Sequence, residues 1–391
     1  MSHNSVNQLL ICLKNSFQNI DCLKKRQRIL QFKHLFYVKL LSIANKHGYA
    51  TSTSHLKYNF NIKVTSQAVN KAFLALDSQH IEKITSSVLN LIPSSSTKRF
   101  LAVDGSWLAV NKQIAQDNQS YLLTNSSSYA LPLLTAIYDL KNRVPIKILL
   151  TSEHDERKAF LQCLDSVKKG DCLIFDRGYP SRQIIDILSE RKLDFVFRLA
   201  SPNNMIKKPP KGLRIVTYVI KNTTFNLLTS LKIGEFDDII TKNLYHDRWE
   251  IEEWFKYLKR QLNGEFYHQT TVNSVLKELL CQQMLSVIFG YLELINPYKN
   301  GKGCLSYANK IIKYLAKGGI TSSTKLCRVI NHINTTLKTK PRPGRNFPRM
   351  SIQYKGTWYR AKSTDISAGA LCHQLILVGI NLTVDAVIFI K

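Results

Sequence analysis

The sequence has 391 residues, of which 44% are hydrophobic and 10% aromatic; this indicates a folded protein of two or three domains and excludes a largely disordered chain. Lys and Arg number 55 against 27 Asp and Glu, which gives a formal net charge of +28. The excess is spread along the chain, and a folded protein that tolerates such self-repulsion usually has a polyanionic partner. Charge therefore favours nucleic acid over two alternatives, a merely basic housekeeping protein and a protein attracted to anionic membranes.

Several other classes of protein lack support in the sequence. No apolar run reaches the roughly 18 residues of a membrane span, and the N-terminus has no convincing signal-peptide layout. The eight cysteines form no CxxC pair and have no histidines at zinc-ligand spacing, which favours reduced thiols in a cytosolic protein. Glycine patterns of P-loop or dinucleotide-binding sites are also missing, so we expect no small-molecule substrate.

Residues 1–95 are predicted to be helical. The segment QRILQFKHLFYVKLLSIANKHG carries apolar residues at three- and four-residue steps. In VTSQAVNKAFLALDS, either Thr65 or Ser66 is expected to cap a short helix. A short helix after a polar turn in a basic segment is typical of a helix-turn-helix DNA-binding domain, although any small helical bundle has the same pattern.

Strand-like and helical runs alternate after Lys98. Three strand-like runs come first, and a helix, a strand, a second helix and a further strand follow up to residue 198. This order predicts an α/β domain with a mixed sheet. Two more strand-like runs, RIVTYVI and TFNLLTSL, interrupt the alternation within residues 199–235 before helical sequence resumes.

Two aspartates end apolar runs of this predicted sheet. Asp104 in VDGSW and Asp176 in FDRGY are each followed by a glycine within two residues. Ligand groups in open α/β sheets lie just beyond the carboxyl ends of the strands, so aspartates there on neighbouring strands could share hard cations. Mg²⁺ prefers oxygen ligands and often uses one or two carboxylates together with substrate phosphates. Taken singly, each Asp and Gly pair is also explained as an ordinary turn.

The segment NLYHDRWEIEEWFKYLKRQL, residues 243–262, is predicted to form one amphipathic helix. At ~100° per residue, one stripe of this helix carries four polar side chains: Tyr245, Arg248, Glu252 and Lys259. The adjacent face is apolar and would seat the helix on the sheet: Ile251, Phe255, Leu258 and Leu262. Glu250 and Glu253 point away, so Glu252 is the acid at the edge of the buried face. The alternative is a solvated stripe on which Arg248 and Glu252 form an ordinary i,i+4 pair.

Two strand-end aspartates and a helical glutamate make a set suited to two metal ions, which can activate an attacking oxygen and stabilise a leaving one in phosphoryl transfer. These three acids, with the spacing Y-x2-R-x3-E-x6-K around the glutamate, resemble the DDE transposases of bacterial insertion sequences. More narrowly, they resemble the insertion-sequence-four family with its Tyr-Arg-Glu-Lys signature. The resemblance runs from about residue 100 to residue 259 and includes LLTSL, DRGY and RWEIEEWFKYLK.

The resemblance implies a fold and a reaction. The fold is a ribonuclease-H-like mixed sheet with flanking helices, a small β-rich insertion between the second Asp and the Glu, and an N-terminal helical domain that binds terminal inverted repeats. The reaction is cut-and-paste transposition: strand cleavage leaves 3′-OH ends, often through a DNA hairpin, and these attack target DNA. A homodimer pairs both element ends in the synaptic complex, in the cytoplasm of a bacterium and at its nucleoid.

The resemblance also implies roles for individual residues. The ligands of two Mg²⁺ ions, with Mn²⁺ as a substitute, would be three carboxylates: Asp104, Asp176 and Glu252. Three side chains would contact phosphates near the transposon end: Tyr245, Arg248 and Lys259. Phe225 precedes LLTS, where relatives carry a tryptophan that stacks on a flipped base; a core-strand phenylalanine is the alternative reading of that position.

The predicted domains are 1–95, helical and DNA-binding; 98–198, the first part of the catalytic core; 199–235, the β-rich insertion; 236–295, the second part of the core with the Glu helix; and 296–391, a C-terminal region for dimerisation or DNA contact. Only 75 residues separate Asp176 from Glu252, so the insertion is small. The final apolar segment, LCHQLILVGINLTVDAVIFIK, fits a docked strand, a dimer contact or an irregular extension of the reading frame.

Two alternative functions are weighed against an active transposase. One is a catalytically silent relic that binds inverted repeats without cutting, and the other is a ribonuclease-H-like nuclease such as a junction resolvase. The intact set of three acids argues against loss of the active site. The basic helical N-terminal segment and the four-residue signature argue against the nuclease.

Overall fold

The computed structural model describes the following residues: 3–22, 29–45, 49–93, 98–115, 129–260, 262, 264, 267, 269–295, 324 and 328. Contacts divide the chain into two compact units, residues 1–343 and 344–391, and every described residue belongs to the first unit. The predicted C-terminal region therefore lies outside the described residues, apart from two helical positions. The finer division of the chain into domains stays a prediction.

Five helices make up the described part of residues 3–93, as the apolar periodicity predicts: α1 (His3–Cys22), α2 (Phe32–Asn45), α3 (Tyr49–Phe60), α4 (Ser66–Leu74) and α5 (Ser78–Leu89). Of the two predicted caps, Thr65 is the one used, and its side chain accepts a hydrogen bond from the Ala68 amide at 3.2 Å. Asp77 caps α5 through the amide of Gln79. These caps satisfy amides that the first turn leaves unbonded, so they fix where each helix begins.

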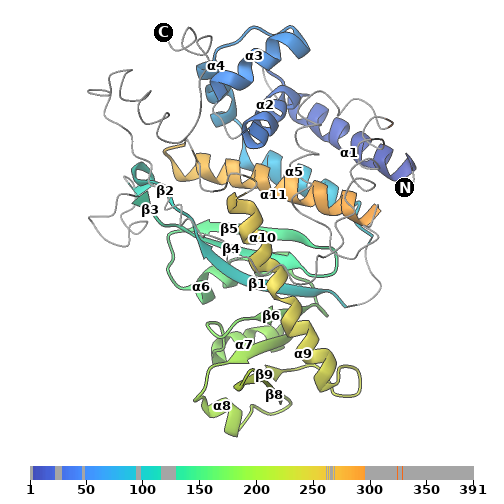
Figure 1. The fold of residues 1–391 in the computed structure, drawn as a ribbon, viewed down its shortest axis with the longest axis vertical. Coiled ribbons are helices and arrows are strands. Elements are labelled where there is room, and N and C mark those ends of the chain that lie inside the picture. Colours follow the sequence, from blue (N-terminus) through green and yellow to red (C-terminus); the bar gives the residue numbers. More distant parts are fainter. Residues whose placement is uncertain are drawn as a thin grey trace, which may run out of the picture. The chain divides into compact units, whose positions relative to one another are not determined.

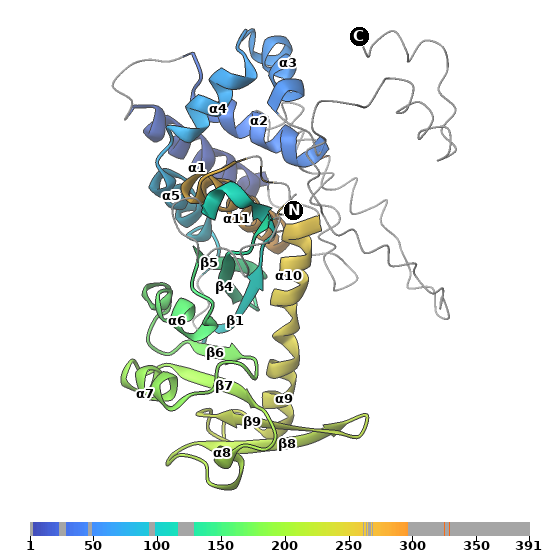
Figure 2. The same cartoon turned by 90° about the vertical axis from the view of Figure 1, so that its left-hand side faces the viewer.

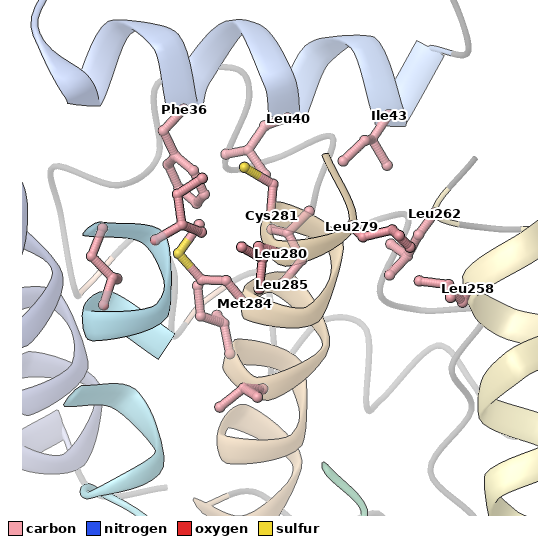
Figure 3. Close-up of a cluster of buried hydrophobic side chains, with 14 of the residues drawn as sticks. Phe36, Leu40, Ile43, Leu258, Leu262, Leu279, Leu280, Cys281, Met284 and Leu285 are labelled. Carbon is pink, nitrogen blue, oxygen red and sulfur yellow. The ribbon is translucent and has the colours of Figure 1, made fainter. Parts of the chain in front are cut away.

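The longest described helix, α11 (Val272–Ile295), lies between these N-terminal helices and the sheet and packs on α5 and on strand β5 (Figure 1). Figure 3 shows apolar side chains of α2, such as Leu40, and of α10, such as Leu258, on either side of it. Among the described helices, α11 alone is long and apolar enough to cross a membrane, but 83% of its apolar window is buried inside the protein. It is the central helix of the core that joins the helical part to the sheet.

A buried ion pair fixes how the N-terminal helices sit on α11. Lys39 Nζ on α2 lies 2.7 Å from Glu278 Oε1 on α11, and their side chains are only 7% and 4% exposed. The neighbouring Lys277 donates to the Leu74 carbonyl at the end of α4. Because buried charges need a partner at a defined position, these contacts set the register of α2 and α4 against α11.

The main sheet has seven strands in the order β5-β4-β1-β6-β7-β9-β8. Their bounds are β1 (Phe100–Trp107), β4 (Leu133–Asp139), β5 (Val144–Thr151), β6 (Cys172–Phe175), β7 (Asp194–Leu199), β8 (Arg214–Ile220) and β9 (Thr223–Thr229). Strands β1, β6 and β7 are parallel neighbours, and the outer strands pair antiparallel. This is the mixed, ribonuclease-H-like sheet that the sequence predicts. Short elements complete it: β2 (Val110–Asn111), η1 (Lys112–Ala115), β3 (Tyr129–Ala130), η3 (Leu164–Ser166) and α8 (Asn204–Lys207).

Helices cover both faces of the sheet. Figure 2 shows α9 (Asp238–Asp247) and α10 (Trp249–Arg260) end to end along one face, with α6 (Glu156–Leu161) and α7 (Arg182–Glu190) on the other. Side chains of β1 alternate between these faces: Leu101 and Val103 join the core beneath α6 and α7, whereas Ala102 joins the core that includes α10 and α11. By the same alternation, Asp104 faces α10 and Gly105 faces α6.

The segment predicted as a β-rich insertion extends the sheet. Its two strands, β8 and β9, form a hairpin, and β9 pairs antiparallel with β7. Lys221 and Asn222 form the turn with φ angles of 46° and 62°. Two left-handed residues are typical of the tight turn whose twist matches that of the flanking strands. The insertion thus contributes two further strands to the sheet that carries the predicted aspartates.

The buried ion pair gives a stability test. Lys39→Met is expected to lower the free energy of unfolding by about 3 kcal/mol, because it removes the cation from the buried Glu278 carboxylate. The double variant Lys39→Met/Glu278→Leu should regain most of this loss. Urea denaturation followed by circular dichroism measures both. As a control, Lys256→Ala in the exposed pair with Glu253 should change stability by no more than ~0.5 kcal/mol. A Lys39→Met protein as stable as wild type would contradict the assignment.

Candidate active site

Asp104 lies in the half of β1 that leads to its carboxyl end, on the face covered by α10. Its Oδ1 atom accepts a hydrogen bond from the Gly105 amide at 2.9 Å, and Arg248 Nη1 lies 3.5 Å from its Oδ2 atom. Burial raises the pKa of the Asp104 carboxyl from 3.8 to about 7. Arg248 and the Gly105 amide oppose this rise, while the charges of Glu156 and Glu252 add to it. Asp104 is therefore an acid whose charge depends on its neighbours.

Asp176 lies beside Asp104 at the same edge of the sheet. Strands β1 and β6 run parallel with Val103 opposite Phe175, so each aspartate is the next residue after this pair. The Tyr245 hydroxyl donates to Asp176 Oδ1 at 3.3 Å, and Arg198 Nη1 on β7 lies 4.0 Å from the same oxygen. The two acids lie side by side on neighbouring strands, as predicted, but only Asp176 follows the end of its strand, because β1 continues past Asp104 to Trp107.

The predicted single helix over residues 243–262 is two helices that meet at Arg248. Arg248 keeps helical backbone angles, but the amides of Arg248 and Ile251 bond to carbonyls three residues back, so the helix tightens there. The predicted faces persist across this junction. The apolar face is buried: Ile251, Phe255, Leu258 and Leu262. Glu250 and Glu253 pair elsewhere, with Arg143 and Lys256, so Glu252 is the glutamate left at the site.

Arg248 links two of the three acids. Its Nη2 atom donates to Glu252 Oε1 at 2.7 Å, while Nη1 faces Asp104. The residue is only 8% exposed, and its Nε and Nη1 atoms make no hydrogen bond with any described group. A buried guanidinium with unused donors is suited to bind a further anionic group.

Of the remaining predicted residues, Tyr245 contacts this centre directly, whereas Lys259 contacts the end of β1 and Phe225 is linked to Asp176 through Arg198. Burial raises the pKa of Tyr245, the donor to Asp176, to about 12, which keeps its hydroxyl protonated. Lys259 Nζ donates to the Trp107 carbonyl at 2.7 Å and ties α10 to the end of β1. Phe225 on β9 is half-buried and stacks on Tyr218 with ring centroids 5.2 Å apart, with the Arg198 guanidinium 4.6 Å from its own centroid. The structure thus places Phe225 near Asp176 by way of Arg198.

Sequence reasoning missed two charged residues of the site. Arg198 lies in a strand that is otherwise largely apolar, and that interruption is a signal that could have marked it. Glu156, at the start of α6, approaches both aspartates across Gly105 and Gly178. Nothing in its local sequence, HDERKAF, separates it from the other acids of an exposed helix start. The contacts of Glu156 are with glycines distant in sequence, and such contacts produce no periodic pattern in the sequence.

The donor set fits a hard divalent cation, although the chain by itself does not form a closed metal cage. Asp104, Asp176 and Glu252 offer only carboxylate oxygens, which Mg²⁺ prefers. Within the described ranges, no group of three His, Cys, Asp or Glu side chains converges closely enough to hold one ion. The guanidinium of Arg248 stands between Asp104 and Glu252 and supplies the positive charge there.

The seven-stranded mixed sheet with helices on both faces is consistent with the class of ribonuclease-H-like domains. Comparison with protein families is more specific: residues 95–287 match the transposase DDE domain, and this range contains Asp104, Asp176 and Glu252. The chain thus contains a DDE transposase domain.

Structure and sequence searches add two findings. The fold is similar to a cryo-EM structure of the piggyBac transposase synaptic complex with hairpin DNA, with 11% sequence identity and a TM-score of 0.47. That similarity covers 86% of this chain and 84% of the other. A search of curated protein sequences finds no match.

The raised pKa of Asp104 predicts a pH dependence of stability in the metal-free protein. Between pH ~4 and ~7 the unfolded chain has lost this proton and the folded chain retains it, so stability falls as pH rises and levels off above ~7. The expected loss is on the order of 4 kcal/mol, and Asp104→Asn should abolish it. Urea titrations at several pH values in EDTA measure the difference. Asp186→Asn, at an exposed position of α7, is the control. Identical pH profiles for wild type and Asp104→Asn would contradict the assignment.

Proposed function

We propose that the protein is the transposase of an insertion sequence, which cuts the element out at its terminal inverted repeats and joins its ends to target DNA. One observation carries the proposal: within the DDE domain, Asp104 in β1 and Asp176 directly after β6 lie side by side on neighbouring parallel strands, and Arg248 links Glu252 on α10 to Asp104. Acids at these positions are suited to in-line displacement at phosphorus.

The metal ions of this site are two Mg²⁺, with Mn²⁺ as a substitute, and Asp104, Asp176 and Glu252 would hold them. When bound, such ions activate the attacking oxygen and stabilise the leaving one. In the chain alone, Arg248 supplies the positive charge between Asp104 and Glu252.

Phosphates of the transposon end are held by basic and hydroxyl groups beside the acids. The unused Nε and Nη1 donors of Arg248 are buried at the centre of the site, where a phosphate oxygen would satisfy them. Tyr245 keeps its proton and can donate to a phosphate as it now donates to Asp176. Lys259 adds a positive charge at the end of β1. These contacts position the DNA strand without reading its sequence.

Phe225 offers a flat surface for a flipped base. Its ring and that of Tyr218 are almost parallel, at 3°, and a cation lies over each of them, Arg198 over Phe225 and Lys242 over Tyr218. Aromatic faces flanked by cations are common platforms for unstacked bases. A flipped base is expected where cleavage passes through a tightly bent DNA hairpin.

The Tyr-Arg-Glu-Lys spacing supports assignment of the protein to the insertion-sequence-four family. The N-terminal helices would bind the inverted repeats, and two copies would pair the element ends in a synaptic complex. The site of action is the bacterial cytoplasm, at the nucleoid. The charge of +28 supports a DNA partner.

A cleavage assay tests the function directly. Purified protein is incubated with a plasmid that carries its own gene and several hundred flanking base pairs, with Mg²⁺ or Mn²⁺, beside an Asp104→Ala control. Metal-dependent excision at flanking inverted repeats, absent in the control, is the expected result. Specific binding to those repeats without a cut would instead identify a silent relic.

The role of Glu252 gives a matched pair of variants. Glu252→Gln should abolish cleavage because it removes a charged metal ligand, and it should leave binding to the element end within about threefold of wild type, since most affinity comes from phosphate contacts elsewhere. The control is Glu253→Gln. Glu253 is the next residue and pairs with Lys256 away from the site, so this variant should cut normally. If Glu252→Gln still cuts, the third carboxylate is assigned wrongly.

DNA affinity should depend steeply on salt. Each phosphate contact releases a condensed counterion, so log affinity should fall linearly with log salt concentration at a slope of about −0.9 per contact. Fluorescence anisotropy with a labelled element end, from about 50 to 300 mM salt, measures the slope. We expect about −4 or steeper. A flat response would rule out a broad electrostatic footprint.

A further inference from the structure

A fourth carboxylate lies at the active site. Glu156 is the first residue of α6, on the face of the sheet opposite α10. The residue before it, Asp155, caps the helix and accepts a hydrogen bond from the Arg157 amide at 2.9 Å. Asp155 therefore serves the helix end, and the Glu156 carboxylate is left to face the sheet.

Two glycines, which have no side chain, allow the Glu156 carboxylate to approach the site. A Cβ atom on Gly105 would lie 3.0 Å from Glu156 Oε1, and one on Gly178 would lie 3.7 Å from Glu156 Oε2. Each carboxylate oxygen thus rests against the backbone that follows one of the two aspartates. The Gly105 amide also donates to Asp104, so Glu156 contacts the peptide that positions that acid. A residue with a side chain at 105 would push Glu156 away.

Charge coupling supports the same proximity. The charge of Glu156 raises the pKa of Asp104, and the charge of Asp176 raises that of Glu156 after burial, the largest cause. The buried Tyr179 side chain opposes these causes, since its hydrogen bond lowers the pKa of Glu156. The site therefore contains clustered negative charge, which Tyr179 partly offsets at Glu156.

The charge balance favours cations. When all four are ionised, the carboxylates of Asp104, Asp176, Glu252 and Glu156 are opposed by the two guanidinium groups paired with them, Arg248 and Arg198. The excess is two negative charges, and it would be one without Glu156. Repulsion within this excess of negative charge destabilises the metal-free fold. The same repulsion is relieved when divalent ions bind, so it favours their binding.

We propose that Glu156 is a positioning residue of the metal site, which acts through Asp104 and Asp176 to raise the affinity of the chain for its divalent ions. The inference rests on the proposed function, since it concerns the ions of that reaction. Mutation of outer-shell groups around metal ligands commonly changes metal affinity ten- to a hundredfold. The alternative is a purely structural acid that stabilises the start of α6.

Glu156→Gln in the full-length protein separates these roles. A positioning role predicts that Mn²⁺ affinity, measured by electron paramagnetic resonance, falls by about tenfold. It also predicts that the melting temperature in EDTA rises, because one repelling charge is gone. A structural role predicts the opposite: a lower melting temperature and unchanged Mn²⁺ affinity. Glu153→Gln is the control, since Glu153 contacts the Asp155 amide and Lys158 in the same loop. Its Mn²⁺ affinity should match wild type.

A second variant tests the same contact from the glycine side. Gly105→Ala places a methyl group 3.0 Å from Glu156 Oε1 and 3.1 Å from Leu133 Cδ1, so Glu156 must shift. Mn²⁺ affinity should fall, and the further loss on adding Glu156→Gln should be smaller than the loss that Glu156→Gln causes alone. Fully additive losses would overturn the proposal.

Cleavage distinguishes failure of this inference from failure of the proposed function. If wild type cuts the element ends, Glu156→Gln should need about tenfold more Mn²⁺ for half-maximal rate and should reach nearly the wild-type rate at saturation. An unchanged metal requirement would overturn the role of Glu156 alone. If wild type binds Mn²⁺ but never cuts, the proposed function fails, and the affinity comparison still decides whether Glu156 supports metal binding.

Discussion

The burial of Asp104, together with repulsion from neighbouring carboxylates, is the constraint on which the site depends. Burial is the largest cause of the raised pKa of Asp104, and neighbouring acids add to it. The groups that oppose the repulsion are placed atom by atom: Arg248 between two acids, the Gly105 amide on one Asp104 oxygen, and Tyr245 on Asp176. Arg248 matters most, because one buried side chain reaches acids that come from a strand and from a helix.

The fold holds these charges by apolar packing. The position of Glu252 depends on how α10 packs. The buried face of α10 lies in the same core as α11 and one face of β1. Its far end is tied to β1 by Lys259. The two aspartates need no such support, since adjacent parallel strands align their carboxyl ends by hydrogen bonding alone. The third acid is thus the one whose position is most sensitive to distant changes in the core.

The difference between the two strand aspartates and the helical glutamate also determines which parts of the site could be predicted from the sequence. Asp104 and Asp176 could be found because each ends an apolar run, and the stripe of Tyr245, Arg248 and Glu252 because helical periodicity is regular. The tightening at Arg248 could not, because it keeps helical angles and changes only the hydrogen bonding. The pairing of β9 with β7 and the approach of Glu156 are contacts between segments distant in sequence, which leave no local pattern.

The charge of the whole chain is positive and the charge of the site is negative. This difference implies a sequence of two events in the proposed reaction. A net charge of +28 attracts DNA at any metal concentration, but at physiological salt its field decays within about 8 Å of each group. Inside the site, the excess of carboxylates repels a phosphate that only Arg248, Tyr245 and Lys259 would hold. The local repulsion is relieved when divalent ions neutralise the acids. In the proposed reaction, attraction of DNA to the basic chain and engagement of the scissile phosphate would therefore be separate steps, and the second would need the divalent ions that Asp104, Asp176 and Glu252 would hold.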